Sequence, residues 1–301
     1  MTSVNEDNLS IEKVFKAVED GDAQLCKLFI ERAENTNPLN DEGSSLLHIA
    51  AKCGRVDIFQ LIMETLDDKN PPNTSGWTPL HWAAKTGQLE ICQMIKEHVV
   101  DMNPANKFGN TPLHLAACEG HYHICELILK SVTDKNPTNV ADAGKTPLHY
   151  AALKGHFNIC KLIVENVEDT NPADEDGWTP LHSAARLNCD KGIDIYRLIM
   201  DTIEDKNPAD LNGDTPLHYA ALHNSIEVCR IIIDKVDDKN PVAANGTTPL
   251  HNAAQQGYSD ICQMIMTNVE EKHPVDDEGM RPIDLAQEEE HFQIVCLINS
   301  A

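Results

Sequence analysis

Hydrophobic and polar positions along the chain predict pairs of short helices. The first helix of a pair begins at Thr-Pro-Leu-His-x-Ala-Ala, because threonine is a favourable N-cap and proline is tolerated at the first helical position. The second helix carries an apolar stripe at helical spacing, for example Ile91, Cys92, Met94 and Ile95. Glycine closes most first helices, and Asn-Pro follows the second, where proline cannot continue a helix. The pattern predicts a recurring helix–turn–helix unit.

This unit repeats with a period of 33 residues and two interruptions. The motif histidine stands at positions 48, 81, 114, 149, 182, 218 and 251, and Asp284 occupies the next slot. The steps are therefore 33 residues except for 35 before His149 and 36 before His218. We expect one repeat domain over residues 1–301, because such units account for nearly the whole chain. It divides into an N-terminal capping unit at 8–38, repeats at 41–71, 74–104, 107–137, 142–172, 175–208, 211–241 and 244–274, and a C-terminal capping repeat at 277–301.

A single unit cannot bury its own apolar face, so stacking of the units is required. The 33-residue period and six copies of Thr-Pro-Leu-His-x-Ala-Ala resemble the ankyrin-repeat family. This resemblance implies an all-α solenoid of stacked helix pairs with projecting β-hairpin fingers. It also implies binding of other proteins through the fingers and the concave inner-helix face. The chain departs from the family where Gly-Ala-Asp-Val-Asn usually follows the second helix, because an aliphatic residue and Asp-x-Asn-Pro stand there instead.

Charge and cysteine usage narrow the class of protein. The chain has 48 acidic and 24 basic residues, a formal charge of −24, which argues against nucleic acid and against an anionic membrane surface. We find neither a signal peptide nor an apolar run approaching the ~18 residues of a transmembrane helix. The ten cysteines lie mostly in apolar stretches, which favours a reducing compartment. We expect a monomer in the cytoplasm, with the nucleus as an alternative location.

The seven motif histidines are the most conspicuous candidate metal ligands, but their spacing argues against that role. Histidines in equivalent slots should lie about one helix-packing distance apart, roughly 8–10 Å, whereas zinc requires nitrogen ligands at about 2 Å. The family resemblance implies a structural role instead, in which each histidine joins its own threonine to a neighbouring turn. These structural residues are His48, His81, His114, His149, His182, His218 and His251.

Two other segments match binding motifs only in part. One cluster crosses a helix–loop–helix junction, so its two histidines should face different ways and a metal site is not expected; it consists of Cys118, His121, His123 and Cys125. The Gly-Lys-Thr string at 144–146 matches the end of a phosphate-binding loop, but Asn139 replaces the first glycine of that motif. We predict no catalytic residue, no metal, no cofactor and no enzyme.

Partner-binding residues should occupy the slots that vary between units. Interfaces concentrate their energy in Trp, Tyr and Arg, and such residues recur on the fingers and inner helices. The predicted stripe consists of Trp77, Trp82, Lys85, Phe108, Tyr150, Lys154, Trp178, Arg186 and Tyr219. In an alternative interpretation these aromatic residues belong to the framework and pack on the next unit.

Acidic residues gather on the fingers, as at 174–176, and two interpretations remain open. In one interpretation the acidic residues attract a basic partner electrostatically. In the other, which is favoured, they keep the protein soluble. The two insertions lie within TNVADAGK and RLNCDKGID. Each marks a binding face, or it is an extension that a loop accepts at little energetic cost.

The predicted function is a non-enzymatic protein–protein interaction module, acting as an adaptor, a scaffold or an inhibitor. The alternative is a targeting or regulatory subunit that recruits substrates to an enzyme on another chain. A recruiting segment after the last repeat would favour the alternative, and almost nothing follows residues 296–298.

Overall fold

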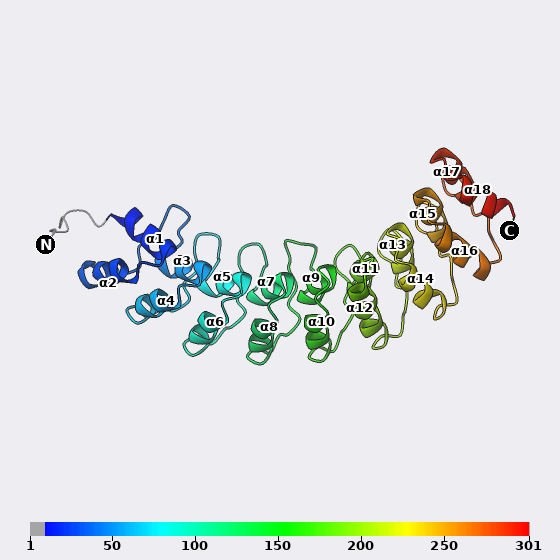
Figure 1. Ribbon diagram of the computed structural model, residues 1–301. Helices are drawn as coiled ribbons and strands as arrows, with labels where there is room; N and C mark the ends of the chain where they lie inside the picture. Colours follow the sequence, from blue (N-terminus) through cyan, green and yellow to red (C-terminus); the bar gives the residue numbers. More distant parts are fainter. Residues whose placement is uncertain (1–9, 301) are drawn as a thin grey trace. The chain divides into compact units, whose positions relative to one another are not determined.

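The computed structural model describes residues 10–300, which form eighteen helices in consecutive pairs (Figure 1). The inner helix of each pair is α1 (Ile11–Asp20), α3 (Leu46–Cys53), α5 (Pro79–Thr86), α7 (Pro112–Glu119), α9 (Pro147–Leu153), α11 (Pro180–Ala185), α13 (Pro216–Leu222), α15 (Pro249–Gln256) and α17 (Pro282–Glu288). The outer helix is α2 (Ala23–Arg32), α4 (Val56–Met63), α6 (Leu89–Lys96), α8 (Tyr122–Leu129), α10 (Phe157–Val164), α12 (Asp190–Met200), α14 (Ile226–Ile233), α16 (Ser259–Asn268) and α18 (Phe292–Asn299). Each predicted repeat and each predicted capping unit contains one such pair. Residues 8 and 9 of the predicted N-terminal capping unit lie outside the described residues.

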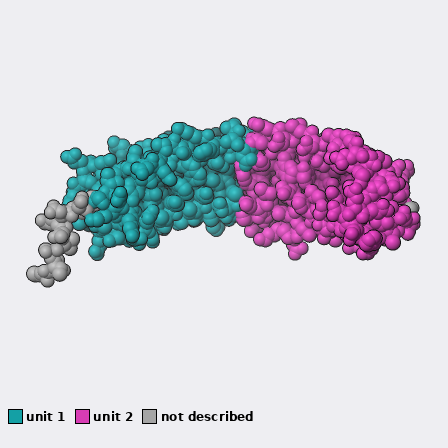
Figure 2. Space-filling model, turned by 90° about the horizontal axis from the view of Figure 1, so that it is seen from above, with its two compact units in different colours: residues 1–142 teal, residues 143–301 magenta. Residues whose placement is uncertain are grey.

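The helix pairs form two compact units, residues 1–142 and 143–301 (Figure 2). Within the first unit the inner helices α1, α3, α5 and α7 pack side by side, and the outer helices α2, α4, α6 and α8 form a second row. The second unit repeats this arrangement from α9 to α18. The predicted all-α repeat solenoid is confirmed. The two-residue insertion of the sequence falls at the boundary between the units.

The core is built from the residues that the repeat keeps constant. In α5 the leucine and the two alanines, Leu80, Ala83 and Ala84, are fully buried, and in α6 so are Ile91 and Cys92. The small alanines allow neighbouring inner helices to approach closely, while the outer helices supply the larger aliphatic side chains. Stability therefore comes from contacts between successive pairs, as expected for stacked repeats.

The connections between pairs are tight turns. In the finger at 73–77 the backbone N–H of Asn73 donates to the carbonyl oxygen of Trp77 at 2.7 Å, and Asn73 Oδ1 accepts from Ser75 N and Trp77 N. Neighbouring fingers are joined by single backbone bonds, such as Lys107 N to Ser75 O at 3.1 Å. Such short contacts do not build a ladder, so within residues 10–300 no regular strand forms where the family resemblance implied β-hairpins. Isolated bridges form there instead, such as the antiparallel bridge between Leu39 and Ser45.

The Asp-x-Asn-Pro segment connects an outer helix to the next inner helix. Asp68 Oδ1 accepts from Asn70 N at 2.9 Å, and Asn70 Oδ1 accepts from the backbone N–H of Leu80, also at 2.9 Å. Lys69 Nζ donates to the Met63 carbonyl oxygen at the end of α4. Asn37, Asn103, Asn171, Asn207 and Asn240 make the bond to the leucine ten residues on in their own repeats. This segment therefore satisfies backbone groups at both helix ends, in addition to stopping the outer helix.

The three-residue insertion changes helix lengths in one pair. Helix α11 has six residues, and α12 has eleven where most outer helices have eight. Gly192 lies in the first turn of α12, and a Cβ placed on it would stand 2.5 Å from the carbonyl oxygen of Leu187. A glycine is required there because the backbone of the preceding loop passes too closely for any side chain.

Candidate functional site

Six of the fingers are each fixed to the preceding inner helix by a motif histidine. Thr78 N donates to His81 Nδ1 at 3.1 Å, so Nε2 carries the proton and donates to the carbonyl oxygen of Asn110 in the next finger at 3.0 Å. The same bond from Nε2 to the next finger is made by His48, His149, His182, His218 and His251, at 2.9 to 3.3 Å. The histidines thereby hold the last residue of each finger, which is where Trp77 and Trp178 stand.

Burial favours the neutral imidazole at five of these positions by lowering the pKa. It lowers the pKa of His81 from its usual value of 6.5 to about 4, against a smaller opposing contribution from the hydrogen bond to Asn110. The pKa of His48, His182 and His218 is lowered to about 4 for the same reason. A neutral imidazole can accept at Nδ1 and donate at Nε2, as the geometry requires, whereas a protonated imidazole cannot accept.

The first unit presents a cluster of two tryptophans and two lysines, called here the tryptophan patch: Lys52, Trp77, Trp82 and Lys85. The ring centroids of Trp77 and Trp82 lie 4.6 Å apart with a tilt of 32°. Lys52 Nζ, from α3, lies 4.8 Å from the Trp82 ring centroid. Lys85 Nζ, from α5, lies 5.6 Å from the Trp77 ring and 5.9 Å from the Trp82 ring. Both indoles are partly exposed, so the patch is a preformed aromatic surface with two cations on it.

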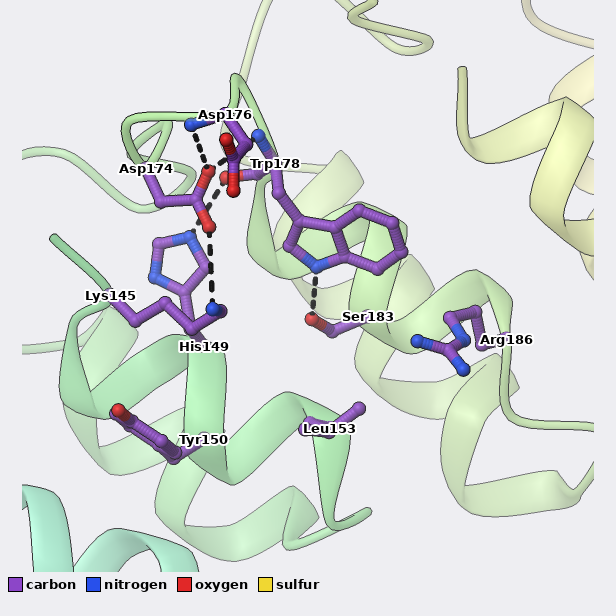
Figure 3. Close-up of a pocket in the computed structure, with 9 residues that line it drawn as sticks. All are labelled: Lys145, His149, Tyr150, Leu153, Asp174, Asp176, Trp178, Ser183 and Arg186. Carbon is purple, nitrogen blue, oxygen red and sulfur yellow. Dashed lines mark hydrogen bonds and ion pairs between the residues drawn. The ribbon is translucent and has the colours of Figure 1, made fainter. Parts of the chain in front are cut away.

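The second unit contains a pocket of about 320 Å³ between α9 and the next finger and inner helix (Figure 3). Its walls are Lys145, His149, Tyr150, Leu153, Asp174, Asp176, Trp178, Ser183 and Arg186. The indole of Trp178 is oriented by a hydrogen bond from Nε1 to Ser183 Oγ at 2.7 Å. The Arg186 guanidinium lies 5.6 Å from the Trp178 ring centroid. Trp178 and Arg186 occupy the same repeat slots as Trp77 and Lys85.

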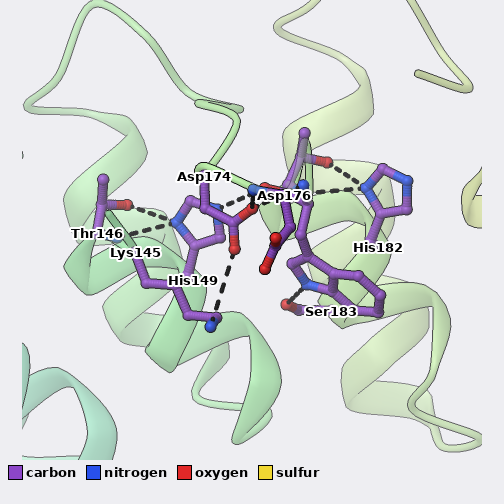
Figure 4. Close-up of polar contacts among 9 residues, drawn as sticks. Lys145, Thr146, His149, Asp174, Asp176, His182 and Ser183 are labelled. Carbon is purple, nitrogen blue, oxygen red and sulfur yellow. Dashed lines mark hydrogen bonds and ion pairs between the residues drawn. The ribbon is translucent and has the colours of Figure 1, made fainter. Parts of the chain in front are cut away.

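Asp174 gives this pocket a mixed charge (Figure 4). Its Oδ1 accepts from the backbone N–H groups of Asp176 and Trp178 at 3.0 and 2.8 Å, as in the other fingers. Its Oδ2 is buried, accepts no hydrogen bond within residues 10–300, and lies 3.8 Å from Lys145 Nζ. The pocket therefore has acidic as well as basic groups in its wall, whereas the tryptophan patch has only basic ones.

Tyr219 packs against the Trp178 ring. The two rings meet edge to face with centroids 4.6 Å apart, and Tyr219 Oη donates to Asp210 Oδ2 at 3.0 Å. Burial, followed by the bond to Asp210, raises the pKa of Tyr219 well above its usual value. Tyr219 is therefore a neutral donor that fixes the ring edge against which Trp178 packs.

The predicted partner-binding residues separate into two groups. The structure brings Trp77, Trp82 and Lys85 together in the first unit, and Tyr150, Trp178, Arg186 and Tyr219 together in the second. Phe108, on a finger, and Lys154, after α9, are exposed and join neither group.

Sequence reasoning missed several members of the two clusters: Lys52, Lys145, Asp174, Asp176, Ser183 and Asp210. Lys52 could have been found, because it occupies the slot of Lys85 in the preceding repeat.

The other candidate ligands are separated by the fold. His121 Nε2 lies 3.1 Å from the carbonyl oxygen of Lys85, whereas His123 Nδ1 lies 3.9 Å from Glu126 Oε2. Cys125 is buried and Cys118 partly exposed. Over the part of the chain that the structure describes, no three His, Cys, Asp or Glu side chains are placed to hold a metal ion. Within the same residues, no helix combines the length and apolar character needed to cross a membrane.

Comparison with known families identifies the repeat. A family model described as ankyrin repeats, in three copies, matches residues 14–103, 66–139, 94–174, 132–207, 164–243 and 191–275. These overlapping matches run without a gap from residue 14 to residue 275. No curated protein matches the chain.

Proposed function

Because the chain belongs to the ankyrin-repeat family, whose repeats are generally protein–protein interaction modules, we propose that it is a non-enzymatic adaptor, scaffold or inhibitor. It binds its partner through the inner helices and fingers. The observation that carries this proposal is the pair of preformed tryptophan clusters, one in each unit, with Trp77 and Trp178 in equivalent slots.

These clusters have the properties of interface hot spots. Trp77 is fixed by its backbone, which donates to Asn73 Oδ1 and accepts from His48 Nε2, and its ring packs on Trp82. An aromatic side chain that is already ordered loses little entropy on binding, and its partly exposed ring offers a large area to bury. The framework interpretation accounts for the contact between the rings, but it gives no role to the cations that lie over them.

The experiment is a pull-down with the purified chain as bait. Wild type is compared with Trp77→Ala/Trp82→Ala, with Trp178→Ala, and with the control Leu39→Ala/Phe292→Ala, which removes two exposed apolar side chains outside both clusters. Circular dichroism and thermal melts verify that all four proteins fold. We expect the tryptophan variants to lose a partner that the control retains.

The identity of that partner separates the two roles considered above. An enzyme captured together with its substrate would favour the targeting or regulatory subunit. An enzyme whose activity the chain blocks would favour an inhibitor, and a partner that is not an enzyme would favour an adaptor or a scaffold. Equal capture by wild type and both tryptophan variants would refute the proposed surface.

A cytoplasmic location is part of the proposal, supported by ten free cysteines, of which six are buried. The basic partner considered above is supported only by the acidic fingers, since the tryptophan patch has the opposite local charge.

A further inference from the structure

We propose that the tryptophan patch binds an acidic segment of the partner, in which carboxylates flank an apolar side chain. Lys52 and Lys85 contact the carboxylates, and the Trp77–Trp82 pair receives the apolar side chain. This inference rests on the proposed function and specifies the chemistry of the partner at that surface.

The first reason is that the two lysines have no acidic partner. Neither Lys52 nor Lys85 makes an ion pair within residues 10–300, and the helices that carry them, α3 and α5, contain no acidic residue. The chain has 48 acidic residues against 24 basic ones, and some of its basic residues do pair, as Lys130 does with Glu126 at 2.7 Å. The patch is therefore a local cationic site on an acidic protein.

The second reason is that the aromatic surface is already occupied by cations. With Lys52 Nζ 4.8 Å from the Trp82 ring and Lys85 Nζ between 5 and 6 Å from both rings, an incoming Lys or Arg would meet two like charges. A carboxylate would be attracted by both ammonium groups, and the indoles would still offer apolar area beside it. Charge complementarity thus selects an acidic segment over a basic one.

The second unit provides an internal comparison. Arg186 lies over Trp178 as Lys85 lies over Trp77, but Asp174 and Asp176 line the same pocket (Figure 3). Lys145 already lies near the buried carboxylate of Asp174. The charges of that pocket balance, so it should not discriminate strongly between acidic and basic segments. Selectivity for acid is therefore assigned to the first unit alone.

Distance limits the opposing effect of the total charge. The formal charge of −24 repels an acidic partner, but interactions between exposed charges are largely screened beyond about 8 Å at physiological salt. Contacts at the patch are made within that distance. Binding is therefore decided by Lys52 and Lys85, provided that the acidic segment is short.

The test uses a short fluorescent peptide in which glutamates flank a Phe-Leu pair, with versions carrying Gln or Lys in place of Glu. Fluorescence anisotropy measures binding of each peptide to the full chain. The site variant is Lys52→Gln/Lys85→Gln, which removes the charges and keeps the stems. The matched control is Lys27→Gln/Lys96→Gln, which makes the same change in net charge at exposed positions on the outer helices α2 and α6. A conservative variant, Lys52→Arg/Lys85→Arg, retains both charges.

We expect wild type to prefer the Glu peptide over the Gln and Lys peptides. The Gln variant at the site should weaken Glu-peptide binding about five- to thirtyfold, the arginine variant should retain it, and the control should change it less than about twofold. Equal binding of the Glu and Gln peptides to wild type would overturn the inference, and so would an equal loss in the control. If a partner is captured in a tryptophan-dependent way but the Glu peptide shows no preference, the proposed function stands and this inference fails.

Discussion

Acidification from pH 7 to pH 5 should destabilise this protein through its buried motif histidines. His48, His81, His182 and His218 have pKa values lowered from 6.5 to about 4 by burial. A lowered pKa means that the unfolded state takes up the proton first. The stabilisation is therefore complete above about pH 6.5 and is lost progressively as the pH falls toward 4.

The size of the effect follows from the two pKa values. At pH 5 each of the four histidines should cost roughly 2 kcal/mol relative to pH 7, which is roughly 4 kcal/mol for each unit, since each unit contains two of them. Asp214 acts in the opposite direction, because burial, with a contribution from the charge of Asp210, raises its pKa and acid then favours its folded state.

The assay is urea unfolding followed by circular dichroism at pH 7, 6 and 5. Wild type is compared with His81→Gln and with a control, His98→Gln, at an exposed position. His81→Gln should be less stable than wild type at pH 7 but should lose less stability on acidification, and His98→Gln should behave as wild type. A midpoint that stays constant between pH 7 and 5, or an unchanged pH dependence in His81→Gln, would refute the reasoning.

Three further predictions concern the framework. Gly192→Ala should lower the free energy of unfolding by about 1–3 kcal/mol, because the new Cβ would meet a backbone carbonyl oxygen at 2.5 Å. Thermal melts measure this change, and a neutral effect would contradict the packing described for α12. Asn103→Ala should cost about 1 kcal/mol more than Asn136→Ala, because only Asn103 Oδ1 accepts a hydrogen bond from the next inner helix; equal urea midpoints would contradict this. A thiol reagent should label the folded protein at its exposed cysteines and reach the buried cysteines only in urea. Burial blocks access to those thiols and also raises their pKa. Fast labelling of the buried cysteines without urea would contradict this prediction. The exposed cysteines are Cys53, Cys189 and Cys296.

The sequence predicted the helix pairs well because their signals are local. Thr78 caps α5, Pro79 is its first residue, and Gly87 closes it with φ at 79°, as the motif indicated. These features depend on a few neighbouring residues whose backbone preferences are strong. The role of Asn70 was seen only in part, because its bond to Leu80 spans ten residues and needs the geometry of the whole finger.

The clusters were harder to predict because they depend on contacts between repeats. The contact of Lys52 with Trp82 joins two successive inner helices. It can be identified only when the rotation between those helices is known. The same holds for Asp174, which looks like one of many solvated acids in the sequence and is almost fully buried in the fold. Side-chain identity thus indicated the binding surface, while its division into a cationic patch and a mixed-charge pocket required the structure.

Hydroxyl-radical footprinting of the wild-type chain, free and bound to the captured partner, tests the central claim most directly, because it needs no substitution. Oxidation of Trp77 and Trp82 should fall in the complex, while Phe292, an exposed residue on α18, should oxidise at its free rate. Unchanged oxidation of both tryptophans in the complex would contradict the claim that the inner helices and fingers bind the partner.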